Sequence, residues 1–102
     1  MIRSLLYVPA HSERFIAKAH ERGADAIILD LEDAVPPGSK LAARNGLASS
    51  IAMVRRGGAR VFVRVNTGHE QLEDALAACR AGADGLYIPK VQRPQDLAVY
   101  PT

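Results

Sequence analysis

The chain has 102 residues, of which 48% are hydrophobic and 24% charged, and its formal net charge is +2. This balance is typical of one soluble globular domain and argues against disorder. The positive charge is too small, and aromatic residues at 5% too few, to predict a nucleic-acid-binding surface. A single cysteine, Cys79, excludes an internal disulfide. No apolar run is long enough to span a membrane or resembles a signal peptide, so we expect a cytoplasmic protein.

Four short apolar runs alternate with stretches of helical periodicity. The strand candidates are SLLYVP (4–9), AIILDL (26–31), RVFVRVN (60–66) and GLYIPK (85–90). Apolar residues three or four positions apart predict helices over 12–22, 39–56 and 67–82, and Pro94 suits the first turn of a short last helix. This alternation predicts a parallel sheet with right-handed crossovers.

Capping residues mark the expected helix starts. They are Ser12, Ser39 and the pair Thr67 and Glu70, which has the spacing of a capping box. In the third helix we assign Leu72, Leu76 and Cys79 to the core-facing side. Cys79 is then a core residue and not a nucleophile.

Two turns of the chain resemble each other. GADAIIL begins at Gly23 and GADGLYI begins at Gly82, and each would end a helix on glycine before a strand. The similarity has two interpretations. It is either the usual form of a helix-to-strand turn or the sign of a barrel built from repeated βα units.

The polar residues collect where the strands are expected to end. They are His11, Asp30, Glu32, Asp33, Arg64, Asn66 and Lys90, and Pro9 stands beside them at the end of the first strand. In parallel α/β folds, ligands bind beyond the carboxyl ends of the strands. Alternation along a strand predicts that Arg64 and Asn66 point the same way, as do Asp30 and Glu32. Several acids around one arginine suit a divalent metal and a carboxylate substrate.

Each of these residues also has a structural interpretation. The three acids could cap a loop or pair with Lys40 and Arg44, and Arg64 could form a structural ion pair with one of the acids. We interpret Lys40 and Arg44, one helical turn apart, as a solvated helix face and not as a phosphate clamp. The histidines lack metal-ligand spacing, and the sequence contains no P-loop and no GxGxxG motif.

Four motifs in order resemble the start of the citrate lyase beta subunit group of the HpcH/HpaI aldolase family. They are RSLLYVPA, IILDLEDAV followed by PPGSKLAAR, VFVRVN and YIPKV, and together they cover nearly the whole chain. The resemblance implies an α/β fold in which residues 1–102 form the first four βα units of a (β/α)₈ TIM barrel. They would be the N-terminal half of a single lyase domain. The implied activity is Mg²⁺-assisted retro-aldol or Claisen cleavage of a 3-hydroxyacyl-CoA of the citryl-CoA, malyl-CoA or citramalyl-CoA type.

The resemblance also implies roles for single residues. Arg64 resembles the arginine that holds the substrate carboxylate. Glu32 and Asp33 resemble catalytic acids that hydrogen-bond metal waters or the reacting carbons. Asp30, Asn66 and Lys90 are the supporting candidates. The family's direct metal ligands are a Glu and an Asp on the fifth and sixth strands, so the resemblance assigns no direct metal ligand to this chain.

Two departures from the family are visible. Pro9-Ala10 stands where the family usually has Pro-Gly, and the sequence stops after the fourth strand, whereas a typical barrel needs about 250 residues. We therefore expect the chain to be inactive alone and to need a C-terminal half or homo-oligomerisation to cover its open edges. No nucleic-acid or membrane partner is expected. The alternatives are a 2-oxo acid aldolase of the family that does not use CoA, a non-catalytic fragment or assembly partner, and a compact flavodoxin-like domain.

Overall fold

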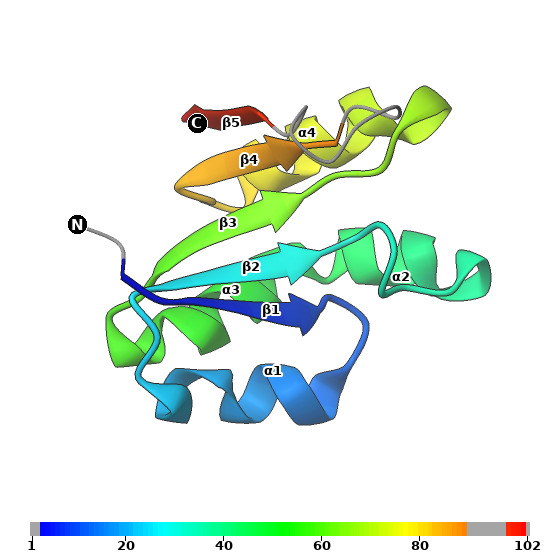
Figure 1. Cartoon of the computed structure of the whole chain (residues 1–102). Coiled ribbons are helices and arrows are strands. Elements are labelled where there is room, and N and C mark those ends of the chain that lie inside the picture. The colour runs from blue at the N-terminus through cyan, green and yellow to red at the C-terminus, as the bar shows by residue number, and fades with distance from the viewer. Residues whose placement is uncertain (1–2, 90–97, 102) are drawn as a thin grey trace.

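The computed structural model describes residues 3–89 and 98–101. Four strands, β1 (Leu5–Pro9), β2 (Ala26–Asp30), β3 (Arg60–Arg64) and β4 (Gly85–Ile88), run parallel in the order β1-β2-β3-β4. Their carboxyl ends meet at one edge of the sheet (Figure 1). The predicted strands, their order and their direction are therefore confirmed, and the sheet is open, as in the first part of a barrel.

Helical segments connect the parallel strands. They are α1 (Glu13–Ala19), α2 (Lys40–Asn45), α3 (Leu47–Val54) and α4 (Gln71–Arg80), with short 3₁₀ turns η1 (His20–Arg22), η2 (Pro37–Ser39), η3 (Arg55–Gly57) and η4 (Gly68–Glu70). The single helix predicted over 39–56 is wrong, because it is interrupted at Gly46, whose ψ of 4° is not helical. Glycine is a weak helix former, so the interruption costs little there.

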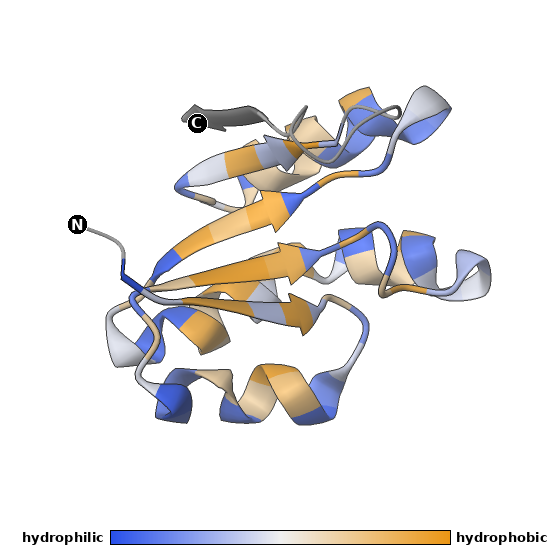
Figure 2. Ribbon diagram, in the orientation of Figure 1, coloured by the Kyte–Doolittle hydropathy of each residue, from blue (hydrophilic) through white to orange (hydrophobic). Residues whose placement is uncertain are grey.

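The two faces of the sheet carry separate hydrophobic clusters. The larger cluster joins alternate strand residues, such as Leu29 and Val63, to the buried faces of the helices, including Leu47 and Ile51. The smaller cluster contains Ala26, Ile28 and Phe62 on the other face, with Tyr87 packed against it. Figure 2 shows apolar residues along most of β2 and β3. In the described part of the chain, the helices therefore cover one face of the sheet, and the other face corresponds to the inside of a barrel.

Helix α4, which corresponds to the helix predicted over 67–82, turns a different side to the core than the sequence predicts. Leu72 and Leu76 are 68% and 44% exposed, and Cys79 is exposed too. The buried side of α4 instead contains Asp74 and Ala78. The assignment of Cys79 to the core is therefore wrong. Small side chains let the helix lie close to the sheet, and Asp74 finds partners there.

Only one of the predicted caps forms. The hydroxyl of Ser12 accepts a hydrogen bond from the backbone N–H of Phe15 at 3.4 Å. Ser39 and Thr67, both within the described residues, make no side-chain capping bond, so these two predictions are wrong. The chain enters both helices through 3₁₀ turns, whose backbone hydrogen bonds take over the capping role.

The two similar turns have the same structural role. Gly23 and Gly82 both adopt the left-handed conformation, with φ of 73° and 89°. The aspartate after each turn then fastens the beginning of a neighbouring strand. Asp25 accepts from the backbone N–H groups of Arg3 and Ser4, just before β1, and Asp84 accepts from that of Val61 in β3 at 2.8 Å.

The C-terminal part differs from the expectation. A further strand, β5 (Ala98–Pro101), pairs antiparallel with β4 and was not predicted. The helix expected at Pro94 and the position of Lys90 lie outside the described residues, so both stay predictions. Within the described part of the chain, no helix has the length and apolar character needed to cross a membrane.

Candidate active site

Asp30 and Arg64 form the central contact at the carboxyl edge of the sheet. The strand register places Asp30 beside Arg64, with Pro9 and Tyr87 on the flanking strands. The guanidinium donates from Nε to Asp30 Oδ1 at 2.9 Å and from Nη2 to Oδ2 at 2.6 Å. Side-by-side positions on neighbouring strands thus produce a two-point pair from residues far apart in the sequence.

The carboxylate of Asp30 also shapes the loop that follows β2. Its Oδ1 accepts from the N–H of Glu32 at 2.8 Å, and its Oδ2 accepts from that of Ala34 at 3.1 Å. Burial alone would raise the pKa of Asp30, but hydrogen bonds from Arg64 and the two amides outweigh it and lower that pKa. Asp30 is therefore held as a carboxylate that fixes both an arginine and a loop.

Glu32 and Asp33 bring two more carboxylates to Arg64. Glu32 Oε1 lies 3.8 Å from Nε of Arg64, and Asp33 Oδ2 lies 3.8 Å from Nη2. The Glu32 side chain is 20% exposed and that of Asp33 is 79% exposed. Burial, followed by the charge of Asp33, raises the pKa of Glu32. The structure thus brings the three predicted acids together around Arg64, and their catalytic and binding roles stay predictions.

Aromatic rings border this group on the inner face of the sheet. The guanidinium carbon of Arg64 lies 5.5 Å from the centre of the Tyr7 ring, within the range of a cation–π contact. Tyr87 and Phe62 pack with ring centroids 5.7 Å apart. Burial raises the pKa of Tyr87, and Tyr7 adds to the effect. The arginine therefore has an acidic partner on one side and an aromatic ring on another.

Asn66 belongs to a second polar network. Its Oδ1 accepts from Lys40 Nζ at 2.7 Å, and its Nδ2 donates to Asp74 Oδ2 at 2.7 Å. Asp74 is almost completely buried and also accepts from the N–H of Asn66 at 2.9 Å and from Arg44 Nη1 at 3.4 Å. Asn66 was predicted to act beside Arg64, but its side chain instead joins α2 to α4.

Sequence reasoning missed the partners in this network. Lys40 and Arg44 were interpreted as a solvated face, and this is wrong because both are partly buried and hydrogen-bonded. Asp74 was not singled out at all. Its signal was the spacing to Ala78, since a helix with an aspartate among small residues on one side has to pair that aspartate if it is buried there.

The turn after β1 forms without the glycine that the family usually has there. Ala10 is buried and donates its N–H to the carbonyl of Asp30 at 2.9 Å, without the positive φ that would require glycine. Pro9-Ala10 therefore forms this turn without strain.

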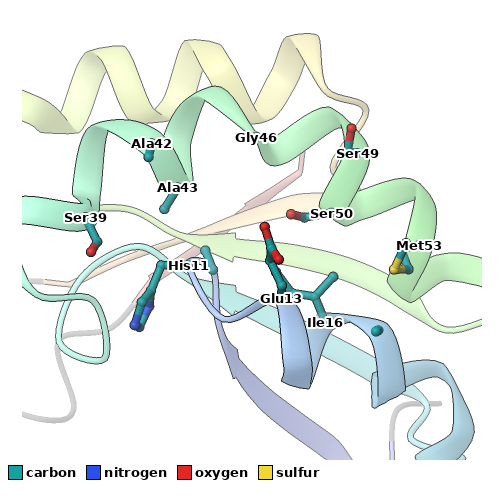
Figure 3. A pocket seen from close by; sticks show the side chains of 12 residues that line it. His11, Glu13, Ile16, Ser39, Ala42, Ala43, Gly46, Ser49, Ser50 and Met53 are labelled. Atoms are coloured by element: carbon teal, nitrogen blue, oxygen red, sulfur yellow. The ribbon is translucent and has the colours of Figure 1, made fainter.

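His11 lies apart from the acids and Arg64. It lines a hollow of about 540 Å³ between α1 and α2–α3, together with Glu13 and Ser50 (Figure 3). None of the three acids or Arg64 lines that hollow.

The carboxylates at the carboxyl edge of the sheet limit the kind of contact that a metal ion could make there. Within the described residues, no group of three or more His, Cys, Asp or Glu is arranged to hold a metal ion. Both oxygens of Asp30 are engaged by Arg64 and backbone amides. Glu32 and Asp33 carry hard oxygen atoms, the kind that suit Mg²⁺ and its bound waters. These two carboxylates fit contact with a hydrated Mg²⁺, and their part in holding a metal stays a prediction.

A protein-family comparison connects this geometry with known proteins. Residues 3–100 match the model described as HpcH/HpaI aldolase/citrate lyase. The chain belongs to this family. Its members among the similar proteins are lyases or related CoA-ester enzymes. The resemblance of the four sequence motifs is thus confirmed, and so is the assignment to an enzyme family.

Individual relatives give the range of activities within the family. The chain is 44% identical over 100 residues to a (3S)-malyl-CoA thioesterase of Cereibacter sphaeroides, covering 93% of this chain and 34% of that protein. It is 32% identical over 100 residues to the mitochondrial citramalyl-CoA lyase of Homo sapiens, covering 93% and 29%. Against a malyl-CoA/beta-methylmalyl-CoA/citramalyl-CoA lyase of Chloroflexus aurantiacus it is 31% identical over 102 residues, covering 93% and 29%. The chain therefore spans about a third of the length of these relatives.

Proposed function

We propose that this chain supplies the substrate-carboxylate part of the active site of a carbon–carbon lyase acting on a 3-hydroxyacyl-CoA. The supporting observation is Arg64, held by Asp30 at the carboxyl edge of the strands with Glu32 and Asp33 nearby. The names of the relatives support malyl-CoA or citramalyl-CoA as the substrate type, and one relative is named a citrate lyase beta subunit. Citryl-CoA is the third candidate, from the resemblance of the sequence motifs. By this proposal the 102-residue chain has no activity of its own.

The pair with Asp30 leaves Arg64 suited to a second carboxylate. An arginine has five N–H donors, and Asp30 takes one on Nε and one on Nη2. The edge formed by Nη1 and Nη2 is the second edge at which a guanidinium grips a carboxylate in a fork. Asp30 fixes the orientation of that edge, which is the geometric requirement for placing a substrate.

The remaining acids have a different part in the proposal. Glu32 and Asp33 would contact the waters of a bound Mg²⁺, which polarises the substrate oxygens when it is present. In the cleavage, a base takes the proton of the 3-hydroxyl group and the carbon–carbon bond breaks. Its electron pair goes to the carbon next to the thioester, which later accepts a proton. The products are an oxo acid and a shorter acyl-CoA.

Thioester hydrolysis is the second candidate, since the relative at 44% identity is named a thioesterase. The two reactions leave different products. Cleavage of malyl-CoA gives glyoxylate and acetyl-CoA, whereas hydrolysis gives malate and free CoA. A 2-oxo acid aldolase that does not use CoA, or a non-catalytic assembly partner, would give neither pair.

The test is a fusion in which this chain replaces the matching part of the Chloroflexus aurantiacus lyase. We expect the fusion, with Mg²⁺, to convert at least one of malyl-CoA, citramalyl-CoA and citryl-CoA to an oxo acid and an acyl-CoA. The 102-residue chain alone should convert none. Free CoA without an oxo acid would establish the thioesterase instead. A folded but inactive fusion beside an active parent relative would contradict both activities.

A further inference from the structure

Glu32 and Asp33 lie on a segment that has no regular secondary structure. Residues 31–36 leave β2 and reach η2 through bends and turns. Asp30 anchors this segment at its beginning, through the N–H groups of Glu32 and Ala34. The side chains of Leu31 and Val35 are buried in the core, and the N–H of Leu31 donates to the carbonyl of Arg64 at 2.9 Å, so packing and the backbone hold the segment as well. A further contact, on the carbonyl oxygens of Leu31 and Glu32, bears on the orientation of its first turn.

Lys40 makes that contact. Its ammonium group donates to the carbonyl oxygens of Leu31 at 3.0 Å and Glu32 at 2.7 Å, and to Asn66 Oδ1 at 2.7 Å. An ammonium group has three donors, so these three acceptors satisfy it completely. A charged donor forms stronger hydrogen bonds than a neutral one.

The place of Lys40 in its helix supports a specific role. It is the first residue of α2, where a positive charge meets the positive end of the helix dipole and is disfavoured. The side chain is partly buried beside Asn66. The helix dipole and partial burial both disfavour the charge of Lys40. We therefore expect its hydrogen bonds, and not solubility, to be the reason for a lysine at this position.

The acceptor on Asn66 is itself held by hydrogen bonds. Asn66 is buried and held by Asp74, which accepts from both its backbone and its side-chain nitrogen. Asp74 in turn accepts from Arg44 of α2. The acceptor on Asn66 therefore has a fixed position relative to the end of β3, where Arg64 lies.

We infer that Lys40 is a positioning residue: its ammonium group fixes the segment that carries Glu32 and Asp33 to the end of β3 and so sets their distance from Arg64. The effect on the loop stands on the contacts alone. The effect on catalysis rests on the proposed function.

The first test measures amide hydrogen exchange in the 102-residue chain. Lys40→Met keeps the apolar stem and removes the charge and all three donors. We expect the amides of Glu32, Ala34 and Val35 to exchange about tenfold faster or more, while those of β3 change little. Lys18→Met, an exposed lysine on α1, is the matched control and should change neither. Equal acceleration in the loop and in β3 would show a purely global effect and overturn the inference.

The second test restores the ammonium group from solution. In Lys40→Ala we expect ethylammonium to slow exchange of the loop amides back toward the parent rates, and n-propanol to have no such effect. Rescue by both compounds would indicate a filled void and not a positioned charge, which would overturn the inference. If Lys40→Ala does not fold, the exchange rates of Lys40→Met alone decide.

The third test uses the fusion with the Chloroflexus aurantiacus lyase. Loosening Glu32 and Asp33 while Arg64 stays in place should lower kcat about tenfold or more and leave KM within about threefold. Ethylammonium should raise the kcat of Lys40→Ala. A fusion that is inactive with Lys40 intact would count against the proposed function only, since the exchange measurements do not depend on activity. An unchanged kcat together with a loosened loop would overturn the catalytic part of the inference.

Discussion

Asp30 and Arg64, 34 positions apart in the sequence, form a two-point ion pair across the ends of neighbouring parallel strands, with N–O distances of 2.9 and 2.6 Å. Their side chains are 3% and 16% exposed. The register of β2 and β3 places the two residues directly beside each other. The alternative of a structural ion pair for Arg64 is therefore present in the molecule, and it is compatible with a further, substrate-binding role.

Replacing Asp30 with asparagine should destabilise the chain. The change keeps the shape but removes the charge, so Arg64 loses its counter-ion and two backbone amides lose a charged acceptor. We expect a loss of about 2 kcal/mol in the free energy of unfolding, the scale of hydrogen bonds to a charged group. Asp33→Asn, at a side chain that is 79% exposed, should change it by less than about 0.5 kcal/mol. Urea denaturation of both variants measures the difference, and equal losses would contradict the prediction.

The same aspartate should make stability depend on acid pH. The pKa of Asp30 is lowered from 3.8 in the folded chain, so the unfolded state binds more protons in the range between the two values. The contribution is therefore fully present above the unfolded pKa and is lost as pH falls through the folded one. The free energy of unfolding should decrease below about pH 4. The decrease should be smaller in Asp30→Asn than in Asp33→Asn, and parallel pH profiles of the two variants would show that Asp30 is not responsible.

Glu32 should behave in the opposite way. Its pKa is raised, first by burial and then by Asp33, so ionisation of Glu32 opposes folding and the penalty grows as pH rises through its titration. Glu32→Gln should therefore stabilise the chain at pH 7, by about 0.5–1 kcal/mol, the scale of common stabilising substitutions. In the active fusion the same change should weaken the response to Mg²⁺ more than it raises KM. Thermal denaturation and a Mg²⁺ titration measure the two effects, and a destabilised Glu32→Gln would show that its charge is compensated.

Arg64→Lys tests the substrate-binding role. Lysine keeps the charge but cannot hold Asp30 and a second carboxylate through two planar forks. In the fusion, kcat/KM should fall by about 30- to 1,000-fold, which corresponds to about 2–4 kcal/mol of transition-state stabilisation. Lys18→Arg is a control that exchanges the same two residue types on an exposed surface. Parent-like kinetics of Arg64→Lys would mean that Arg64 serves only the pair with Asp30.

Gly57→Ala should destabilise the amino-terminal side of the sheet. A Cβ atom at this position would lie 2.5 Å from the carbonyl oxygen of His20, so η1 and η3 would have to move apart. We expect a loss of about 1–3 kcal/mol, the cost of overpacking. At Gly38 a Cβ meets no atom within 4 Å, so Gly38→Ala is the matched control and should change stability by less than about 0.5 kcal/mol. Equal melting temperatures for the two variants would contradict this close approach.

The strands were the predictable part of the fold. All residues of β2 (Ala26–Asp30) are buried, both on the helix-covered face and on the inner face of the sheet. Such nearly continuous apolar runs stand out in a sequence. The buried side of α4 was not predictable in the same way. Leu72 and Leu76 have the stronger hydrophobic pattern, yet the helix buries Asp74, whose cost is removed by partners that the sequence does not place next to it.

The candidate site also has a part that the sequence predicts and a part that it does not. The acids and Arg64 could be expected together, because the carboxyl ends of parallel strands meet at one edge and the residues follow those ends. The contacts of Lys40 could not. Two of its acceptors are backbone carbonyls, which every residue carries, and the third is an amide 26 positions away. Spacing along a helix therefore predicted an exposed charge where the tertiary structure has a hydrogen-bonded one.

The strand β5 affects how further strands can be added to this sheet. It occupies the outer side of β4 in antiparallel register, with Leu86 opposite Tyr100. A barrel of this family continues with a parallel strand at the same side, and one backbone edge cannot pair with both. Barrel growth past β4 would thus require an exchange of partners, in which β5 dissociates before the incoming strand docks.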